Sequence, residues 1–352
     1  MKNRIRWNKT TRNNYITYAL VIIAFVIMQI LIGAGSISST LKGMLVPICA
    51  YVVMAISLNL TVGVLGELSL GHAGFMSIGA FTGVTAAVAL SKHVTSTPIL
   101  LIVGMIVGAL FAALLGFLIG IPVMRLKGDY LAIVTLAFGE IIKGIFNNLY
   151  VGLDGSGLHI SLLQDTTNLD ETGKLVIGGP MGLSGIPKIS TFTIGVVLVL
   201  VSLVVVFHLV NSRAGRAIMA VRDNRIAAES IGINVTKYKL MAFTVSASLA
   251  GAAGTLFAMN YTTLVANKFD FNTSILILVF VVLGGLGNFL GSIIAATALT
   301  ILPEALREFS DYRMLVYAIV LILVMLATNN DTFKSFLARL KPGRKQKEKE
   351  VA

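Results

Sequence analysis

Long apolar runs, almost free of charged residues, occupy most of this chain. A helix needs about 20 apolar residues to cross the hydrocarbon core of a bilayer, and most of the runs reach that length. Only 12% of the 352 residues are Asp, Glu, Lys or Arg, so a soluble fold would leave apolar surface in water. We therefore predict an all-α polytopic membrane protein. The runs are Tyr15–Gly33, Met44–Leu65, Leu68–Leu90, Pro98–Met124, Tyr130–Leu149, Thr191–Val210, Leu240–Asn260, Thr273–Pro303 and Met314–Thr328.

The eighth run is too long for one helix and too short for two full spans, and glycines interrupt its middle. We divide it near Asn288 into two short or broken spans, which gives about ten transmembrane helices. With the N-terminus inside, this count places twenty Lys and Arg residues on the inner side and seven on the outer side. The positive-inside rule expects such a bias, so both termini are predicted to be cytoplasmic. The net charge of +12 is then explained by orientation in a membrane, and we exclude nucleic acid as a partner.

The predicted domain organisation is a membrane domain between two basic tails. Residues 1–14 and 330–352 form cytoplasmic tails, and residues 15–329 form the transmembrane domain. We expect the first apolar run to be a retained anchor rather than a cleaved signal peptide, because it is long and no clear cleavage site follows it.

The outer loop 151–190 divides the ten spans into five plus five. Halves with an odd number of spans have opposite orientations, so this count permits a 5+5 inverted repeat. Two short segments are weakly similar, as such a repeat would require, although shared glycine-rich composition explains the similarity equally well. They are LGHAGFMSIGA at 70–80 and LGNFLGSIIAA at 286–296. The loop itself is either a solvated connector or a docking surface for an external partner.

The polar segment 211–239 separates two apolar runs on the inner side. Its composition predicts a short amphipathic helix from Ala214 to Ile231, and Gly232 supplies a residue that can end a helix. Such a helix suits docking to a soluble subunit, but a surface helix that lies on anionic lipid has the same pattern. The residues expected on its apolar side are Ile218, Val221, Ala228 and Ile231.

Ionisable residues within predicted spans mark candidates for a translocation path, because their burial in a membrane is costly. Glu140 and Lys143 are three residues apart in the fifth run, where they form either a structural pair or part of the path. Glu67 and His72 lie near a predicted two-residue turn between the second and third runs. Non-helical backbone at this depth needs protein or a wet cavity around it, so region 58–78 is a candidate path lining or gate. The candidate path residues are Asn59, Glu67, Ser69, Gly71, His72, Glu140, Lys143, Gly287 and Asn288.

Five blocks of the sequence, taken together and in order, carry a family resemblance. They are LNLTVGVLGELSLGHAGFMSIGAF (58–81), GDYLAIVTLAFGEIIKGIFNN (128–148), NSRAGRAIMAVRDNRIAAESIGINVTKYK (211–239), TKYKLMAFTVSASLAGAAGTLFA (236–258) and VVLGGLGNFLGSIIAATALTILPEALR (281–307). They resemble the permease subunits of branched-chain amino acid ABC importers, and most closely the M-type permease that partners a shorter H-type sister. The third block resembles the cytoplasmic coupling segment of that family.

The resemblance implies a permease without a nucleotide site. ATP and Mg would bind separate cytoplasmic ATPase subunits, so no cofactor is expected here, and the sequence has no phosphate loop. An external binding protein would deliver a branched-chain or related amino acid, and a sister permease would complete the path. The implied location is the bacterial cytoplasmic (inner) membrane, where the chain contacts lipid. The coupling positions that the resemblance implies are Arg216, Arg222, Asp223, Asn224, Ala227, Ala228 and Gly232.

The main alternative is an ion-coupled secondary transporter of small solutes. It would use Glu67, Glu140 or Lys143 as an ion site and would not need the helix in the polar segment. An enzyme is not expected, because the sequence contains no catalytic triad, HExxH or paired-carboxylate arrangement. No metal site is expected either, because Cys49 is the only cysteine and the histidines are scattered.

Overall fold

A computed structural model describes residues 9–35, 38–91, 94, 96–126, 128–154, 157–162, 173–306, 315, 318, 319 and 322. The chain divides into two compact units, residues 1–297 and residues 298–352, and the site described below lies in the first. The tail 330–352, most of the tail 1–14 and most of the predicted span 314–328 lie outside the described residues.

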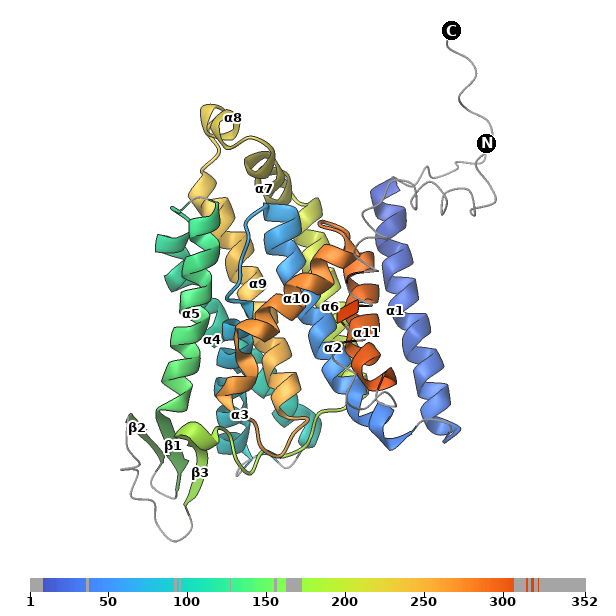
Figure 1. The fold of residues 1–352 in the computed structure, drawn as a ribbon, viewed down its shortest axis with the longest axis vertical. Helices are drawn as coiled ribbons and strands as arrows, with labels where there is room; N and C mark the ends of the chain where they lie inside the picture. Colours follow the sequence, from blue (N-terminus) through green and yellow to red (C-terminus); the bar gives the residue numbers. More distant parts are fainter. Residues whose placement is uncertain are drawn as a thin grey trace. The chain divides into compact units, whose positions relative to one another are not determined.

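Helices make up most of the described chain (Figure 1). Six of them are long and apolar enough to cross a membrane, namely α1, α2 with η1, α3, α4, α6 and α9. They follow the predicted runs closely. The helices are α1 (Lys9–Gly33), α2 (Ser39–Asn59), the π-helix η1 (Leu60–Leu65), α3 (His72–Leu90), α4 (Thr97–Val123), α5 (Asp129–Asn147), α6 (Phe192–Asn211), α7 (Arg213–Asp223), α8 (Arg225–Ser230), α9 (Val235–Ala258), α10 (Phe271–Gly284) and α11 (Phe289–Ala305), with short 3-10 turns η2 (Gly179–Met181) and η3 (Ala266–Phe269).

Three further apolar helices are shorter or carry charge. Helix α5 is 19 residues long but contains three charged side chains, and α10 and α11 have 14 and 17 residues. The predicted division of the eighth run near Asn288 is confirmed, because α10 ends at Gly284 and α11 begins at Phe289. The chain is therefore a polytopic helical protein, while ten spans and the inverted repeat stay predictions.

The outer loop contains a small antiparallel sheet, so the expectation of a purely α-helical chain is wrong here. Strands β1 (Leu149–Leu153), β2 (Leu158–Leu162) and β3 (Lys174–Gly178) pair in the order β2-β1-β3. In the sheet, backbone N–H and C=O groups of this loop form hydrogen bonds with one another that they would otherwise form with water. Leu183 and Leu264 exchange two backbone hydrogen bonds, which tie this loop to the connection between α9 and α10.

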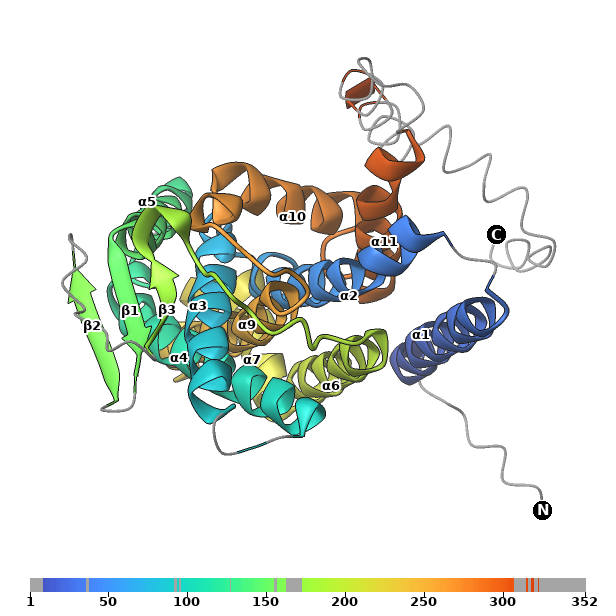
Figure 2. The same cartoon turned by 90° about the horizontal axis from the view of Figure 1, so that it is seen from below.

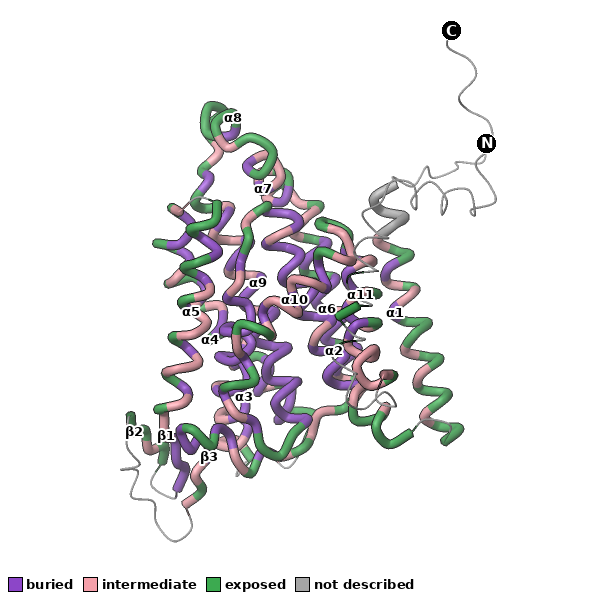
Figure 3. Tube along the Cα trace, in the orientation of Figure 1, coloured by how far each residue is buried: buried purple, intermediate pink, exposed green. Residues whose placement is uncertain are grey.

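The buried interior of the first unit is formed by α2, α3 and α9, with α4, α5, α6 and α10 around them (Figures 2 and 3). Glycines allow the central helices to approach closely. A Cβ atom on Gly79 would lie 1.9 Å from the carbonyl oxygen of Gly251, and one on Gly254 would lie 1.9 Å from that of Met76. Small residues at such crossings are typical of membrane helices. The helices α7 and α8 lie at the opposite end of this unit from the sheet (Figure 1).

Candidate functional site

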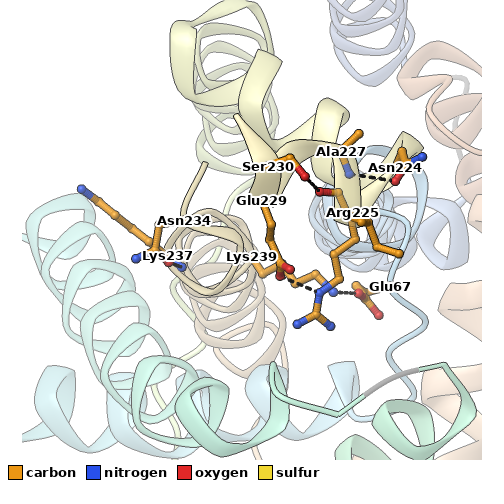
Figure 4. Close-up of polar contacts among 10 residues, drawn as sticks. Glu67, Asn224, Arg225, Ala227, Glu229, Ser230, Asn234, Lys237 and Lys239 are labelled. Carbon is orange, nitrogen blue, oxygen red and sulfur yellow. Dashed lines mark hydrogen bonds and ion pairs between the residues drawn. The ribbon is translucent and has the colours of Figure 1, made fainter. Parts of the chain in front are cut away.

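The polar segment 211–239 forms two short helices, so the prediction of one helix from Ala214 to Ile231 is wrong. The backbone of Asn224 is extended, with φ −154° and ψ 103°, and its Oδ1 accepts a hydrogen bond of 3.0 Å from the amide of Ala227. Asparagine is a favoured N-cap residue, and here it ends α7 and begins α8 (Figure 4). Gly232 follows α8 with φ 85°, as the helix-ending role requires.

The apolar residues of the polar segment divide into a buried set and an exposed set. Val221, Ala228 and Val235 form a cluster inside the chain, and Ile233 packs against it. Ile231 was expected on the same side, but it is exposed because the break at Asn224 turns α8. The exposed apolar side chains are therefore Ile226 of α8 and Ile231, which directly follows α8, whereas Ala228 is covered by its own chain.

The connection between η1 and α3 is non-helical over six residues, 66–71, which we call the unwound segment. The predicted two-residue turn is wrong, because α3 begins at His72 rather than at Leu68. Gly66 has φ 81°, a left-handed conformation that favours glycine. The amide of Leu70 donates to Thr135 Oγ1 of α5 at 3.0 Å, so a neighbouring helix satisfies part of this backbone.

Two side chains of the polar segment bind the broken end of the second span. Arg222 Nη1 donates to the carbonyl oxygen of Gly63 at 3.1 Å, and the Arg222 side chain covers Gly66. Lys239, at the start of α9, forms an ion pair with Glu67 of the unwound segment (Figure 4). The last carbonyls of a helix lack internal partners and carry partial negative charge, so a cation is favourable there. The exposed fractions of Lys239 and Glu67 are only 6% and 13%, which makes this pair part of the interior.

The connection between α10 and α11, residues 285–288, contacts the same broken end, and we call it the glycine turn. Asn59 Oδ1 accepts a hydrogen bond of 2.8 Å from the amide of Gly287, and Asn59 Nδ2 donates to Ser292 Oγ at 3.0 Å. A Cβ atom on Gly63 would lie 1.9 Å from Asn59 Oδ1 and 2.2 Å from the nitrogen of Gly287. Only glycine at position 63 therefore allows the two breaks to meet.

The other candidate path residues lie in different settings. His72 Nε2 and Ser57 Oγ are 2.7 Å apart and both side chains are buried, so this histidine is held within the helix packing. Ser69 is also buried, and its hydroxyl has no hydrogen-bond partner among the described residues. Asn288 Oδ1 accepts from the amide of Gly291 at the start of α11. Their roles in transport stay predictions.

Gly71 lies where α5 meets the start of α3, because a Cβ atom there would be 1.9 Å from the carbonyl oxygen of Thr135. Glu140 and Lys143 of α5 form an ion pair across one helical turn, as their spacing predicts. This pair is separate from the one between Glu67 and Lys239.

Some residues of the site were missed by sequence reasoning. Gly63, Gly66, Lys239 and Ser292 contact the candidate residues but were not among them. The glycines at 63 and 66, close to the end of an apolar run, were a usable signal of a helix end. The pairing of Lys239 with Glu67 had no local signal, because 172 residues separate the two positions.

Comparison with known protein families identifies the family of this chain. Residues 40–325 match the family model described as the permease component of branched-chain amino acid transport systems. The chain belongs to this family. The high-affinity branched-chain amino acid permease protein LivM of Salmonella typhimurium is 34% identical over 333 residues, which cover 90% of this chain and 74% of that protein. LivM of Escherichia coli K12 matches equally well, and the ribose import permease RbsC of the same organism is 28% identical over 269 residues. No solved structure matches the chain.

Membership in this family establishes a multi-pass transport permease of the ABC importer class. A permease component is a transport subunit rather than an enzyme. Transport permeases for an amino acid and for a sugar both match, at 34% and 28% identity.

Proposed function

We propose that this chain is a membrane-spanning subunit of an ATP-powered importer for branched-chain or related amino acids. Separate cytoplasmic ATPase subunits bind ATP and Mg, a sister permease completes the path, and an external binding protein delivers the substrate. The chain lies in the bacterial cytoplasmic membrane with both termini in the cytoplasm. The similarity to LivM supports the substrate class, and the charge distribution supports the orientation.

The observation that carries this proposal is the direct connection between the polar segment and the broken second span. Arg222 bonds the carbonyl oxygen of Gly63, and Lys239 pairs with Glu67. A movement of α7 is therefore passed to the end of η1 through Arg222, and a movement at the start of α9 is passed to the unwound segment through Lys239. Arg222, Asp223 and Asn224 are the expected coupling positions in this connection, and Arg222 Nη2 also pairs with Asp223 at 2.9 Å.

The same contacts explain how the movement would reach a second helix break. Asn59 joins η1 to the glycine turn through Gly287 and Ser292. Closure of the ATPase subunits would displace the polar segment, then the end of η1, and then the start of α11. Both breaks lack regular helical hydrogen bonds, so they deform at lower cost than an intact helix. In this account the broken regions around 58–78 and 285–288 form the gate of the path.

The surface that would meet the ATPase subunit is the exposed part of α8. The exposed fraction of Ile226 is 77%, and Ile231 is similarly exposed, although both follow charged or polar neighbours. The resemblance also places Ala227 in this contact, whereas Ala228 supports α8 from inside. Arg216 lies on the exposed side of α7, where its Nη1 is 3.5 Å from the carbonyl oxygen of Asn211.

Substitution of Ile226 tests this surface. Ile226→Asp should reduce co-purification of the ATPase subunits about tenfold, because burial of an isoleucine contributes roughly 1.5–3 kcal/mol and each 1.4 kcal/mol is tenfold in affinity. Met181→Asp is a matched control on the other end of the unit, with an exposed fraction of 75%, and should leave that association unchanged. Full association of Ile226→Asp would contradict the docking surface. Transport that needs no ATPase but follows an ion gradient would instead support the secondary transporter.

A further inference from the structure

Helix α5 carries an ion pair whose position is fixed by contacts on both sides. Gly139, Lys143 and Asn147 follow one another at four-residue spacing, so they lie on one face of the helix. Gly139 lies against the start of α3, where a Cβ atom on Gly74 would be 2.9 Å from its Cα atom. Asn147 Nδ2 donates to Asn267 of η3 at 3.0 Å. Lys143 therefore extends from the face of α5 that is turned towards the unwound segment and η3.

The proposed orientation places the pair well inside the fifth predicted span. Glu140 is 11 residues from the start of α5, or roughly 16 Å at 1.5 Å per residue. The exposed fractions of Lys143 and Glu140 are 23% and 39% in this chain. Charged groups on a lipid-facing surface at this depth are costly, so a protein wall or a wet path must cover them. Ile141 and Ile145 on the neighbouring face are exposed and apolar, as lipid contact requires.

An uncovered position on α5 lies next to the pair. A Cβ atom on Gly144 would meet no other atom within 4 Å. Gly144 follows Lys143 directly and is four residues from Glu140, so the open position is beside both charges. The unwound segment, whose residue Leu68 is also exposed, lies against α5 one turn before Lys143, because a Cβ atom on Gly139 would be 3.5 Å from the Cα atom of Gly71.

We propose that Glu140 and Lys143 form a site on the translocation path that binds the ammonium and carboxylate groups of a zwitterionic amino acid. This inference rests on the proposed function and adds the chemistry by which the permease recognises its solute. The solute's ammonium binds the Glu140 carboxylate, and its carboxylate binds the Lys143 ammonium. One ion pair is thereby exchanged for two, and no uncompensated charge arises at membrane depth.

The arrangement suits a zwitterion better than an ion or a sugar. A single inorganic ion would leave one member of the pair without its partner, which is costly where water is scarce. A sugar has only hydroxyl groups and needs no separated charges for its recognition.

A variant that neutralises both Glu140 and Lys143 distinguishes a role in solute binding from a role in supporting the fold. In the reconstituted importer with its binding protein, Glu140→Gln/Lys143→Met should lower leucine uptake per ATP hydrolysed about tenfold or more, because two charge-assisted hydrogen bonds to the solute are lost. The ATPase subunits should remain bound. If the pair only supports the fold, the double variant leaves no unpaired charge and transports normally, which would overturn the inference. If the unmodified chain does not associate with ATPase subunits, that result contradicts the proposed function rather than this inference.

Cysteine reactivity gives a second measurement that does not remove the pair. In a Cys49→Ala background, Gly144→Cys should react with a charged, membrane-impermeant methanethiosulfonate during turnover at least about ten times faster than Ile145→Cys, because only thiols in contact with water form thiolate. Leucine delivered by the binding protein should slow that reaction. Equal rates at the two positions, or no protection by leucine, would overturn the inference.

Discussion

The two helix breaks of the first unit are built differently. The break between η1 and α3 is bound by charged side chains, because Arg222 holds Gly63 and Lys239 holds Glu67. The break between α10 and α11 is a tight turn with positive φ at Gly285 and Gly287, and it contacts the first break through the neutral hydrogen bond from the amide of Gly287 to Asn59.

This difference assigns different roles to the two breaks. A charged contact from the polar segment can pull on the first break directly, since such bonds are strong and directional. Within the described part of the chain, the glycine turn is linked to the first break through Asn59 and the close approach at Gly63. We therefore expect the first break to be moved by the ATPase side and the second to follow it.

The largest effect is expected when the ion pair of the first break loses one partner. Lys239→Met leaves the Glu67 carboxylate largely buried and unpaired, which should lower the free energy of unfolding by about 3–5 kcal/mol. Thermal denaturation of the purified protein measures this. The double variant Glu67→Gln/Lys239→Met removes the charge as well and should regain most of the loss. Equal stability of the single variant and the unmodified protein would show that the pair is not buried.

A methyl group at position 63 tests the contact between the two breaks. Gly63→Ala should destabilise the protein by about 1–3 kcal/mol and block transport, because its Cβ would meet Asn59 and the backbone of Gly287. Gly43→Ala, in the same span but with nothing within 4 Å, is the matched control and should stabilise slightly. Normal transport by the Gly63→Ala variant would show that transport does not need the close contact between the two breaks.

Replacement of Asn59 tests whether the glycine turn moves together with the first break. Asn59→Leu keeps the volume but leaves the amide of Gly287 without its acceptor, at a cost of about 1–3 kcal/mol. ATP hydrolysis should continue while uptake per ATP falls. Uptake measured together with hydrolysis in vesicles decides this, and unchanged uptake per ATP would mean that the glycine turn moves independently.

The smallest effect concerns the break inside the polar segment. Asn224→Ala removes the N-cap of α8 and should cost about 1 kcal/mol. Asn272→Ala is a suitable control, because that exposed asparagine bonds only a neighbouring carboxylate and caps no helix. Thermal denaturation compares the two variants, and an equal shift would mean that the cap does not hold α7 and α8 apart.

The spans were predictable from the sequence because they depend on local composition. Runs of about 20 apolar residues gave the helices α1 to α6 and α9, and the cluster of glycines around Asn288 gave the division between α10 and α11. The cap at Asn224 also had a local signal, since asparagine before a helix-forming stretch is a typical N-cap. Its effect was missed because the flanking residues all favour a helix.

The connections of the site were not predictable in this way. Arg222 reaches Gly63 across 159 residues of sequence, and Asn59 reaches Gly287 across 228. Such contacts arise from helix packing, which no periodic pattern encodes. The sequence singled out Asn59, Glu67 and Arg222 as candidates for two separate sites, one for the path and one for coupling, whereas the structure connects their surroundings.

The central claim is that Arg222 and the Glu67–Lys239 pair pass movement from the polar segment to the broken second span. Uptake per ATP hydrolysed tests it most directly in the variant Arg222→Met/Glu67→Gln/Lys239→Met, which removes these contacts without leaving a buried charge. We expect the reconstituted importer to keep its ATPase subunits and hydrolyse ATP, while uptake per ATP falls by about tenfold or more. Uptake per ATP equal to that of the unmodified importer would contradict the claim.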